Sequence, residues 1–110
     1  HGRAEFVRLM LAHSGCNWVD KRFDLDFVEW NTVKPTMPDG GLPVWKEKDK
    51  TLNDTGPMAR YLSKKLGYYP TNAKAAWDVD ATYDFIAEQW DILHMATFFK
   101  KTDDADIENY

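Results

Sequence analysis

The spacing of apolar residues along the chain predicts three helices. Apolar side chains recur at helical intervals over residues 4–14, and Gly15 follows where a left-handed residue commonly ends a helix. A second helix is predicted from Thr55, a good N-cap residue, to the residue before Gly67. A third and longer helix is predicted over residues 71–98, because its apolar positions alternate steps of three and four. These positions are Ala76, Val79, Tyr83, Ile86, Trp90 and Leu93.

Weaker patterns lie between the first two helices. Residues 18–23 have the composition of a strand, and residues 25–34 predict a short irregular helix that breaks at the following proline. Residues 42–47 and 51–53 flank a polar turn and predict a hairpin of two short strands. Pro43 has no N–H to donate to a sheet, so we expect it at the beginning of a strand, at an edge or in a special turn.

The order of these elements predicts an α/β unit, with the long helix after a linker as a second layer. We place the boundary so that residues 1–68 form the first domain and residues 69–110 begin an all-helical second domain. A helix that opens directly at Ala4 has no preceding strand to dock on, and the sequence has no initiator Met. We therefore expect the natural protein to begin earlier.

The composition is that of a globular protein with a dense core, since five Trp, five Tyr and six Phe occur among 110 residues. A net charge of -4 gives no reason to expect binding to nucleic acid or to an anionic membrane. No apolar run approaches the roughly 20 residues that cross a bilayer. The single cysteine, Cys16, excludes an internal disulfide and fits a reducing compartment, so we expect a cytoplasmic protein. The sequence contains no constellation of metal ligands.

Four segments of the chain resemble the cytosolic glutathione transferases, especially their sigma-like group. They are residues 2–12, similar to the family's first helix, and residues 41–44, 52–55 and 58–62, similar to its glutathione-binding core. The segments follow the family's order and gaps, and the likeness extends over about residues 2–91. It implies a thioredoxin-like glutathione-binding domain followed by the first long helix of an all-α C-terminal domain. It also implies that the family's first strand, which ends near a catalytic Tyr, Ser or Cys, lies before His1.

The same resemblance assigns a glutathione site. Pro43 matches the family's cis proline, so the Leu42–Pro43 bond is expected to be cis and to turn the Leu42 backbone toward the cysteinyl part of glutathione. Thr55 matches the family's Ser, which holds the γ-glutamyl carboxylate together with the N–H groups that open a helix; a plain N-cap is the alternative. Asp54 replaces the family's usual Gln. Its carboxylate would accept from the ammonium of glutathione but would repel the neighbouring carboxylate.

Other matched positions lie elsewhere in the chain. Trp30 and Lys34 match residues that hold the glycyl end, by an indole N–H and by charge; core packing and a solvated cation are the alternatives. Gly41 stands where the family commonly has Gln, so one side-chain contact is lost. Arg3 matches an arginine near the catalytic hydroxyl, or is an exposed cation at a helix start. Asp80 matches an acid that reaches the glutathione of the opposite subunit, or is a surface acid.

The resemblance implies a detoxifying transferase that conjugates the glutathione thiolate to electrophilic small molecules and forms a homodimer. The apolar face of the 71–98 helix is expected to pack on absent parts of the protein and to line the two-fold interface. Four tyrosines do not match the place of the catalytic hydroxyl: Tyr61, Tyr68, Tyr69 and Tyr83. Asp54 and Gly41 favour an alternative, a non-catalytic structural or assembly subunit of the kind found among translation factors and lens crystallins. A prostaglandin isomerase is the third alternative, because sigma-like members include such enzymes.

Overall fold

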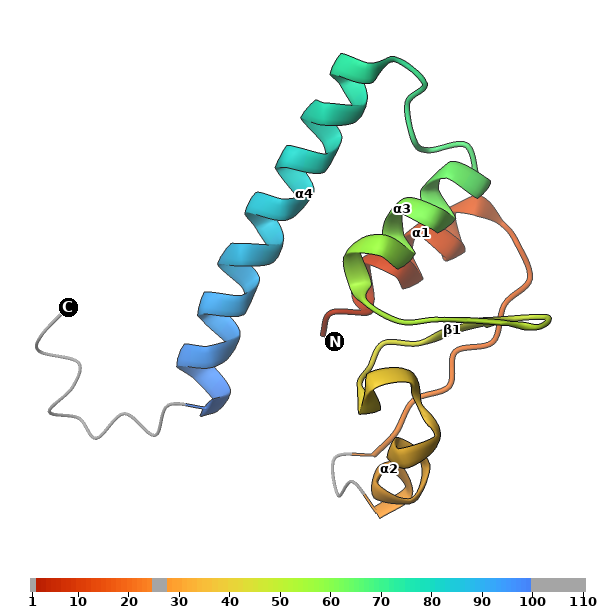
Figure 1. The fold of residues 1–110 in the computed structure, drawn as a ribbon, viewed down its shortest axis with the longest axis vertical. Helices are drawn as coiled ribbons and strands as arrows, with labels where there is room; N and C mark the ends of the chain where they lie inside the picture. Colours follow the sequence, from red (N-terminus) through yellow and green to blue (C-terminus); the bar gives the residue numbers. More distant parts are fainter. Residues whose placement is uncertain (1, 25–27, 100–110) are drawn as a thin grey trace, which may run out of the picture. The chain divides into compact units, whose positions relative to one another are not determined.

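The structure is a computed structural model that describes residues 2–24 and 28–99. Contacts divide the chain into two units, His1–Pro70 and Thr71–Tyr110, which we describe separately (Figure 1). The first unit contains α1 (Glu5–Ser14), α2 (Val28–Val33), the 3-10 turns η1 (Lys34–Thr36) and η2 (Pro38–Gly40), β1 (Trp45–Glu47), β2 (Lys50–Leu52) and α3 (Thr55–Lys65). The second contains α4 (Ala73–His94) and one π-helical turn, η3 (Met95–Phe99). Residues 25–27, where the short irregular helix predicted over residues 25–34 was to begin, lie outside the described part.

The core of the first unit lies between α1 and α3, whose apolar faces pack on each other. Leu11 of α1 and Leu62 of α3 are 2% and 1% exposed. The buried apolar residues are Val7, Met10, Leu11, Met58, Ala59 and Leu62. They recur at intervals of three and four, so they share one side of each helix. The φ of Gly15 is 70°, and its N–H donates to Ala12 where α1 ends. Both helices that the apolar spacing predicted here are confirmed.

Strands β1 and β2 form an antiparallel hairpin, as the sequence predicts, although the first strand is shorter than expected. Trp45 pairs with Leu52, and Glu47 pairs with Lys50. Pro43 precedes β1 and takes no part in the sheet, which agrees with its lack of an N–H donor.

The strand predicted over residues 18–23 is wrong. Residues 16–24 contain neither helix nor paired strand, and Val19 is 91% exposed. A β-strand is completed by hydrogen bonds from a neighbouring strand. In the part of the chain that the structure describes, the two-stranded hairpin is the whole sheet, so this extended segment has no backbone partner.

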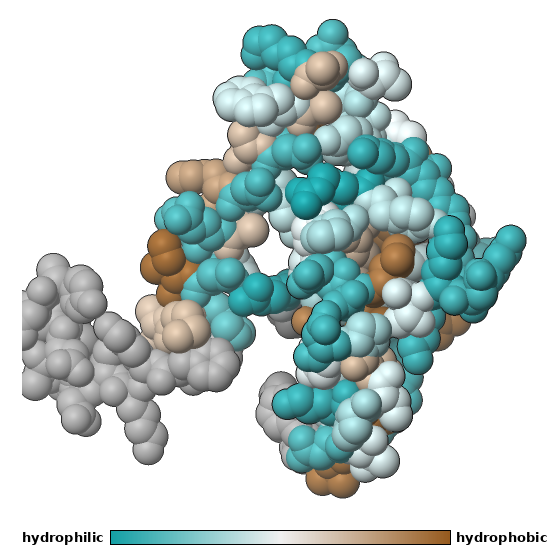
Figure 2. Space-filling model, viewed as in Figure 1, coloured by the Kyte–Doolittle hydropathy of each residue, from teal (hydrophilic) through white to brown (hydrophobic). Residues whose placement is uncertain are grey.

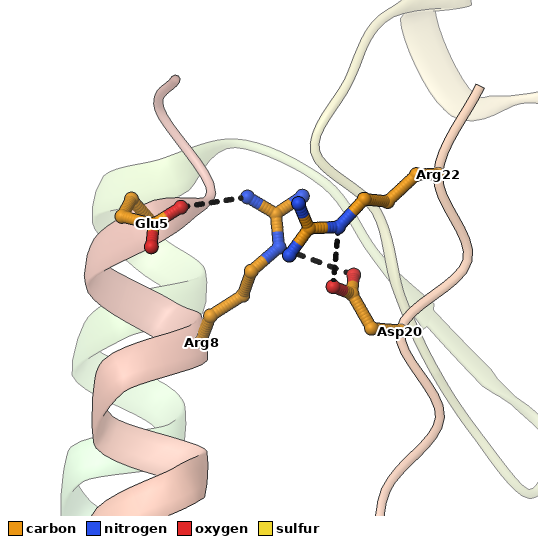
Figure 3. Close-up of polar contacts among 4 residues, drawn as sticks. All are labelled: Glu5, Arg8, Asp20 and Arg22. Carbon is orange, nitrogen blue, oxygen red and sulfur yellow. Dashed lines mark hydrogen bonds and ion pairs between the residues drawn. The ribbon is translucent and has the colours of Figure 1, made fainter. Parts of the chain in front are cut away.

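Side chains hold this extended segment against α1 instead. The Asp20 carboxylate accepts from Arg8 Nε at 3.1 Å and from Arg22 Nε at 2.7 Å (Figure 3). Arg8 also contacts Glu5 at 3.2 Å, one turn away on α1. Partial desolvation raises the pKa of Asp20, but hydrogen bonds from the two arginines outweigh it, so that the pKa lies below its ordinary value. The carboxylate is thus kept ionised between two cations.

A second polar cluster joins the hairpin to α3. Glu47 of β1 accepts hydrogen bonds from Lys65 and, at 3.3 Å, from the Tyr61 hydroxyl; both donors lie on α3. The Trp45 indole N–H contacts the same carboxylate at 3.5 Å. The hydrogen bond from Lys65 is the largest cause that lowers the pKa of Glu47, and it raises the pKa of Lys65 in return. A charged contact therefore joins the hairpin to the C-terminal end of α3.

The second unit is built on α4, whose N-cap residue Asn72 accepts a hydrogen bond from the Ala75 N–H at 3.1 Å. The long helix is confirmed, and it ends at His94, before a π-helical turn. No residue of α4 is buried, and apolar side chains stand among hydrophilic ones on its surface (Figure 2). Its exposed apolar side chains include Trp77, Val79, Phe85, Ile86, Trp90, Ile92 and Leu93. Among the described helices, none is long and apolar enough to span a membrane.

The Glu47–Lys65 contact predicts a pH-dependent stability. The folded pKa of Glu47 is below its ordinary value of 4.5, so the stabilisation is complete above that pH and is lost as pH falls through the folded pKa. Replacing Glu47 by Gln should lower the urea midpoint at neutral pH, and the difference from the unaltered protein should vanish once the pH lies below the folded pKa of Glu47. Tryptophan fluorescence measures both midpoints.

The control for this experiment is Asp49→Asn, which removes an exposed acid from the turn of the same hairpin. Its urea midpoint should follow that of the unaltered protein at both pH values. A Glu47→Gln difference that persists unchanged in acid would mean that lost packing, and not the charge, causes the effect.

Candidate functional site

The hairpin register brings two predicted site segments to the same end of the sheet. Because Trp45 pairs with Leu52, the residues before β1 and the residues after β2 leave the hairpin side by side. The Leu42–Pro43 peptide bond before β1 is cis, which confirms the prediction. Leu42 is 49% exposed, and no hydrogen bond among the described residues uses its backbone N–H or C=O. Its peptide groups are therefore available to an extended ligand.

The segment after β2 opens α3. Asp54 occupies the cap position, and its carbonyl accepts from the Met58 N–H at 3.1 Å. Thr55 is the first helical residue, so the prediction that it is the N-cap is wrong by one position, because the first intrahelical bond already starts at Asp54. Among the described residues, no hydrogen bond uses the N–H groups of Thr55 and Gly56, and Pro57 has none. This helix end offers two donors and a positive dipole to an anion.

Asp54 has an unusual backbone, with φ 63° and ψ 122°. The left-handed region that residues with a Cβ tolerate lies at ψ of about 30–60°, so this conformation is strained. The side chain of Asp54 makes no capping hydrogen bond to α3.

Lys34 and Trp30 lie on the segment that leads toward these residues. Lys34 opens η1, and a Cβ placed on Gly40 would be 3.5 Å from Lys34 Cε. The aliphatic part of Lys34 thus lies against the turn that precedes Leu42. Trp30 lies on α2 and is half-buried, with its ring centroid 5.3 Å from that of Phe23. Packing accounts for part of the Trp30 surface, and a ligand contact stays a prediction.

The remaining predicted residues lie apart from this group. Arg3 is exposed just before α1. Asp80 lies on α4 in the second unit, and its predicted role concerns an opposite subunit, so it stays a prediction. Gly41 is extended, with φ -121°, and offers backbone groups alone.

One contact at the site has no counterpart in the sequence analysis. The Asn53 side-chain amide donates a hydrogen bond to the Asp39 carboxylate, across 14 residues of chain. The run Pro38–Gly41 signals a turn, and a positive φ at Asp39 suits its residue type. Nothing in the sequence pattern, however, shows that Asn53 would meet this turn.

The described geometry defines an α/β, thioredoxin-like unit followed by a long helix, with the candidate site at one end of the hairpin. No family model matches the chain. It is 35% identical to probable glutathione S-transferase 7 of Caenorhabditis elegans, over 81% of this chain and 40% of the relative. It is also 35% identical to S-crystallin SL20-1 of Nototodarus sloanii, over 84% of this chain and 40% of the relative. The chain thus spans less than half the length of these relatives.

Solved structures agree with the sequence matches. A Nu-class GST from Haemonchus contortus has a TM-score of 0.72 and 32% identity, over 79% of this chain and 42% of that chain. Prostaglandin synthase D of Nilaparvata lugens has a TM-score of 0.79 and 27% identity, over 97% of this chain and 52% of that chain. The chain is a homologue of glutathione S-transferases.

The strained backbone at position 54 leads to a stability prediction. Replacing Asp54 by Gly removes the Cβ that makes this conformation unfavourable, and the relief of about 1–3 kcal/mol exceeds the roughly 0.5–1 kcal/mol that glycine costs through the unfolded state. Urea unfolding should therefore show Asp54→Gly to be more stable than the unaltered protein by about 1 kcal/mol. Asp54→Ala keeps the Cβ and serves as control. Equal stability of the two variants would rule out backbone strain at this position.

Proposed function

We propose that the chain forms the glutathione-binding part of a glutathione transferase, which conjugates the glutathione thiolate to electrophilic small molecules. The observation that carries the proposal is the pairing, at one end of the hairpin, of the exposed Leu42 backbone with the open N-terminus of α3. A tripeptide with two carboxylates and an ammonium needs both backbone partners and an anion site. Homology to glutathione S-transferases supports the same function.

Each part of glutathione has a partner in this arrangement. The Leu42 backbone, held next to Pro43, pairs with the cysteinyl residue. The Thr55 hydroxyl and the first N–H groups of α3 bind the γ-glutamyl carboxylate, where the helix dipole favours negative charge. The Asp54 carboxylate accepts from the γ-glutamyl ammonium. Lys34 and the Trp30 indole N–H bind the glycyl carboxylate, and the Lys34 side chain reaches it from beside Gly40.

We assign the dimer interface to the second unit. We place the domain boundary after residue 68, so that α4 begins an all-helical domain. The exposed apolar residues of α4 line a two-fold interface in a cytoplasmic homodimer, and Asp80 reaches the glutathione of the opposite subunit.

The reaction itself requires a thiolate. A hydroxyl that donates a hydrogen bond to the glutathione sulfur lowers the pKa of its thiol and leaves it ready to attack an electrophile. None of the tyrosines at positions 61, 68, 69 and 83 has the place of this hydroxyl, so we assign it to a residue outside this chain. Arg3, exposed before α1, is the cation that supports it.

Two alternatives use the same fold. A non-catalytic structural subunit is favoured by Asp54 and Gly41, which replace polar amides, and the S-crystallin relative is as similar as the transferase. A prostaglandin isomerase is suggested by the likeness to prostaglandin synthase D. The transferase remains the stronger proposal, because Thr55, Lys34 and the exposed Leu42 backbone keep the groups that glutathione requires.

Binding tests the assignment of Thr55. Replacing Thr55 by Ala in the full-length protein removes a hydroxyl that donates to a carboxylate, and hydrogen bonds to charged groups contribute about 1.5–3 kcal/mol. Calorimetry should therefore show a roughly 10- to 100-fold weaker affinity for glutathione. Thr51→Ala, an exposed threonine of β2, is the matched control and should bind like the unaltered protein. Equal affinities for both variants would remove Thr55 from the site.

Turnover separates the enzyme from the structural alternative. The full-length protein should conjugate glutathione to a chlorodinitrobenzene-type electrophile, and residues 1–110 alone should not, because they lack the activating hydroxyl. Glutathione binding without conjugation by the full-length protein would favour the structural subunit. Robust turnover by residues 1–110 would instead give one of the tyrosines the catalytic role.

A further inference from the structure

The turn before Leu42 is closed by its own backbone and is tied to the segment before α3. The Gly40 N–H donates to Met37 at 3.1 Å, and the Gly41 N–H donates to Pro38 at 3.3 Å. At the centre of this turn Asp39 has φ 53° and is exposed, and its carboxylate accepts a hydrogen bond from the Asn53 side-chain amide.

The two residues stand next to the groups that we assign to glutathione. Asp39 precedes Leu42 by three residues, and Asn53 precedes Thr55 by two. Within the described ranges, no other hydrogen bond joins residues 37–43 to residues 53–56. The hairpin fixes where both segments start, but a free turn could still move relative to the helix end. The Asp39–Asn53 hydrogen bond restrains that motion.

A cationic side chain, that of Lys34, lies beside the same turn. The aliphatic part of the Lys34 side chain lies along Gly40, so a movement of the turn would also change the packing of Lys34. The Asn53 amide is a neutral donor, so it orients the Asp39 carboxylate without adding a competing charge to the site. One hydrogen bond thus sets the spacing between the Lys34–Leu42 side and the Asp54–Thr55 side.

We propose that Asp39 and Asn53 form a positioning pair, whose hydrogen bond holds the two sides of the glutathione site at the distance that the tripeptide requires. The proposal rests on the proposed function, and it names residues that contact no ligand themselves. A ligand that bridges two segments binds more tightly when their spacing is set in advance, because less freedom is lost on binding. The pair should therefore act on affinity and on KM, and leave kcat unchanged.

The test uses the full-length protein, four variants of the pair and one control variant. Asp39→Gly removes the acceptor and suits the positive φ, and Asn53→Ala removes the donor. The double variant measures coupling, and Asp39→Asn keeps a side-chain oxygen that can accept from Asn53. Asp49→Gly is the matched control, an exposed acid in the turn of the hairpin. Calorimetry gives the affinity for glutathione, steady-state kinetics give KM and kcat, and thermal unfolding reports the fold.

Each single variant should bind glutathione about 3- to 10-fold more weakly, as expected for one net hydrogen bond. The double variant should lose no more than the weaker-binding single variant, whereas Asp39→Asn and Asp49→Gly should stay within about twofold of the unaltered protein. The proposal would be overturned if the two single losses of affinity added up in the double variant. It would also be overturned if Asp39→Asn bound glutathione as weakly as Asp39→Gly. Unchanged binding in every variant would overturn it and leave the proposed function standing. Failure of the unaltered protein to bind glutathione would overturn both.

Discussion

The contact between α1 and α3 is the interaction on which the first unit depends. These helices have 10 and 11 residues, a length at which isolated helices are marginal in water. Their stability therefore comes from burying one apolar face of each helix against the other. A fully buried Leu or Met contributes about 1.5–3 kcal/mol, so Leu11, Met58 and Leu62 outweigh the polar contacts at the surface. This packing holds α3 in place, and it therefore also holds the N-terminus of α3 in place within the first unit.

Polar contacts then place the remaining segments on this apolar core. Glu47 ties the hairpin to α3 through Lys65, and Asp20 ties the extended segment to α1 through Arg8. The hairpin in turn delivers Leu42 to the same end as the α3 N-terminus. The candidate site is thus a consequence of how a few charged side chains orient short elements, since no large sheet surrounds it in the described residues.

Similarity to known proteins points to the glutathione S-transferase fold, but it does not decide between the candidate functions. The chain is equally identical to a transferase and to an S-crystallin, so overall identity does not distinguish an enzyme from a structural protein. The distinction depends on local chemistry. Thr55, Lys34 and the open helix end suit a peptide with two carboxylates, whereas Asp54 adds a negative charge close to one of them. In the proposed complex, the ammonium of the γ-glutamyl group would balance the charge of Asp54.

The sequence by itself determined the helices, the hairpin and the glycine that ends α1, because these depend on contacts between residues three or four positions apart or across one short turn. The likeness to a family added the cis bond before Pro43 and the candidate roles of Thr55 and Lys34. The tertiary structure decided what depends on distant partners. Residues 18–23 have the composition of a strand, but a strand also needs a neighbour. The hydrogen bond between Asp39 and Asn53 exists because the hairpin returns the chain to the same place, and no local pattern encodes that return.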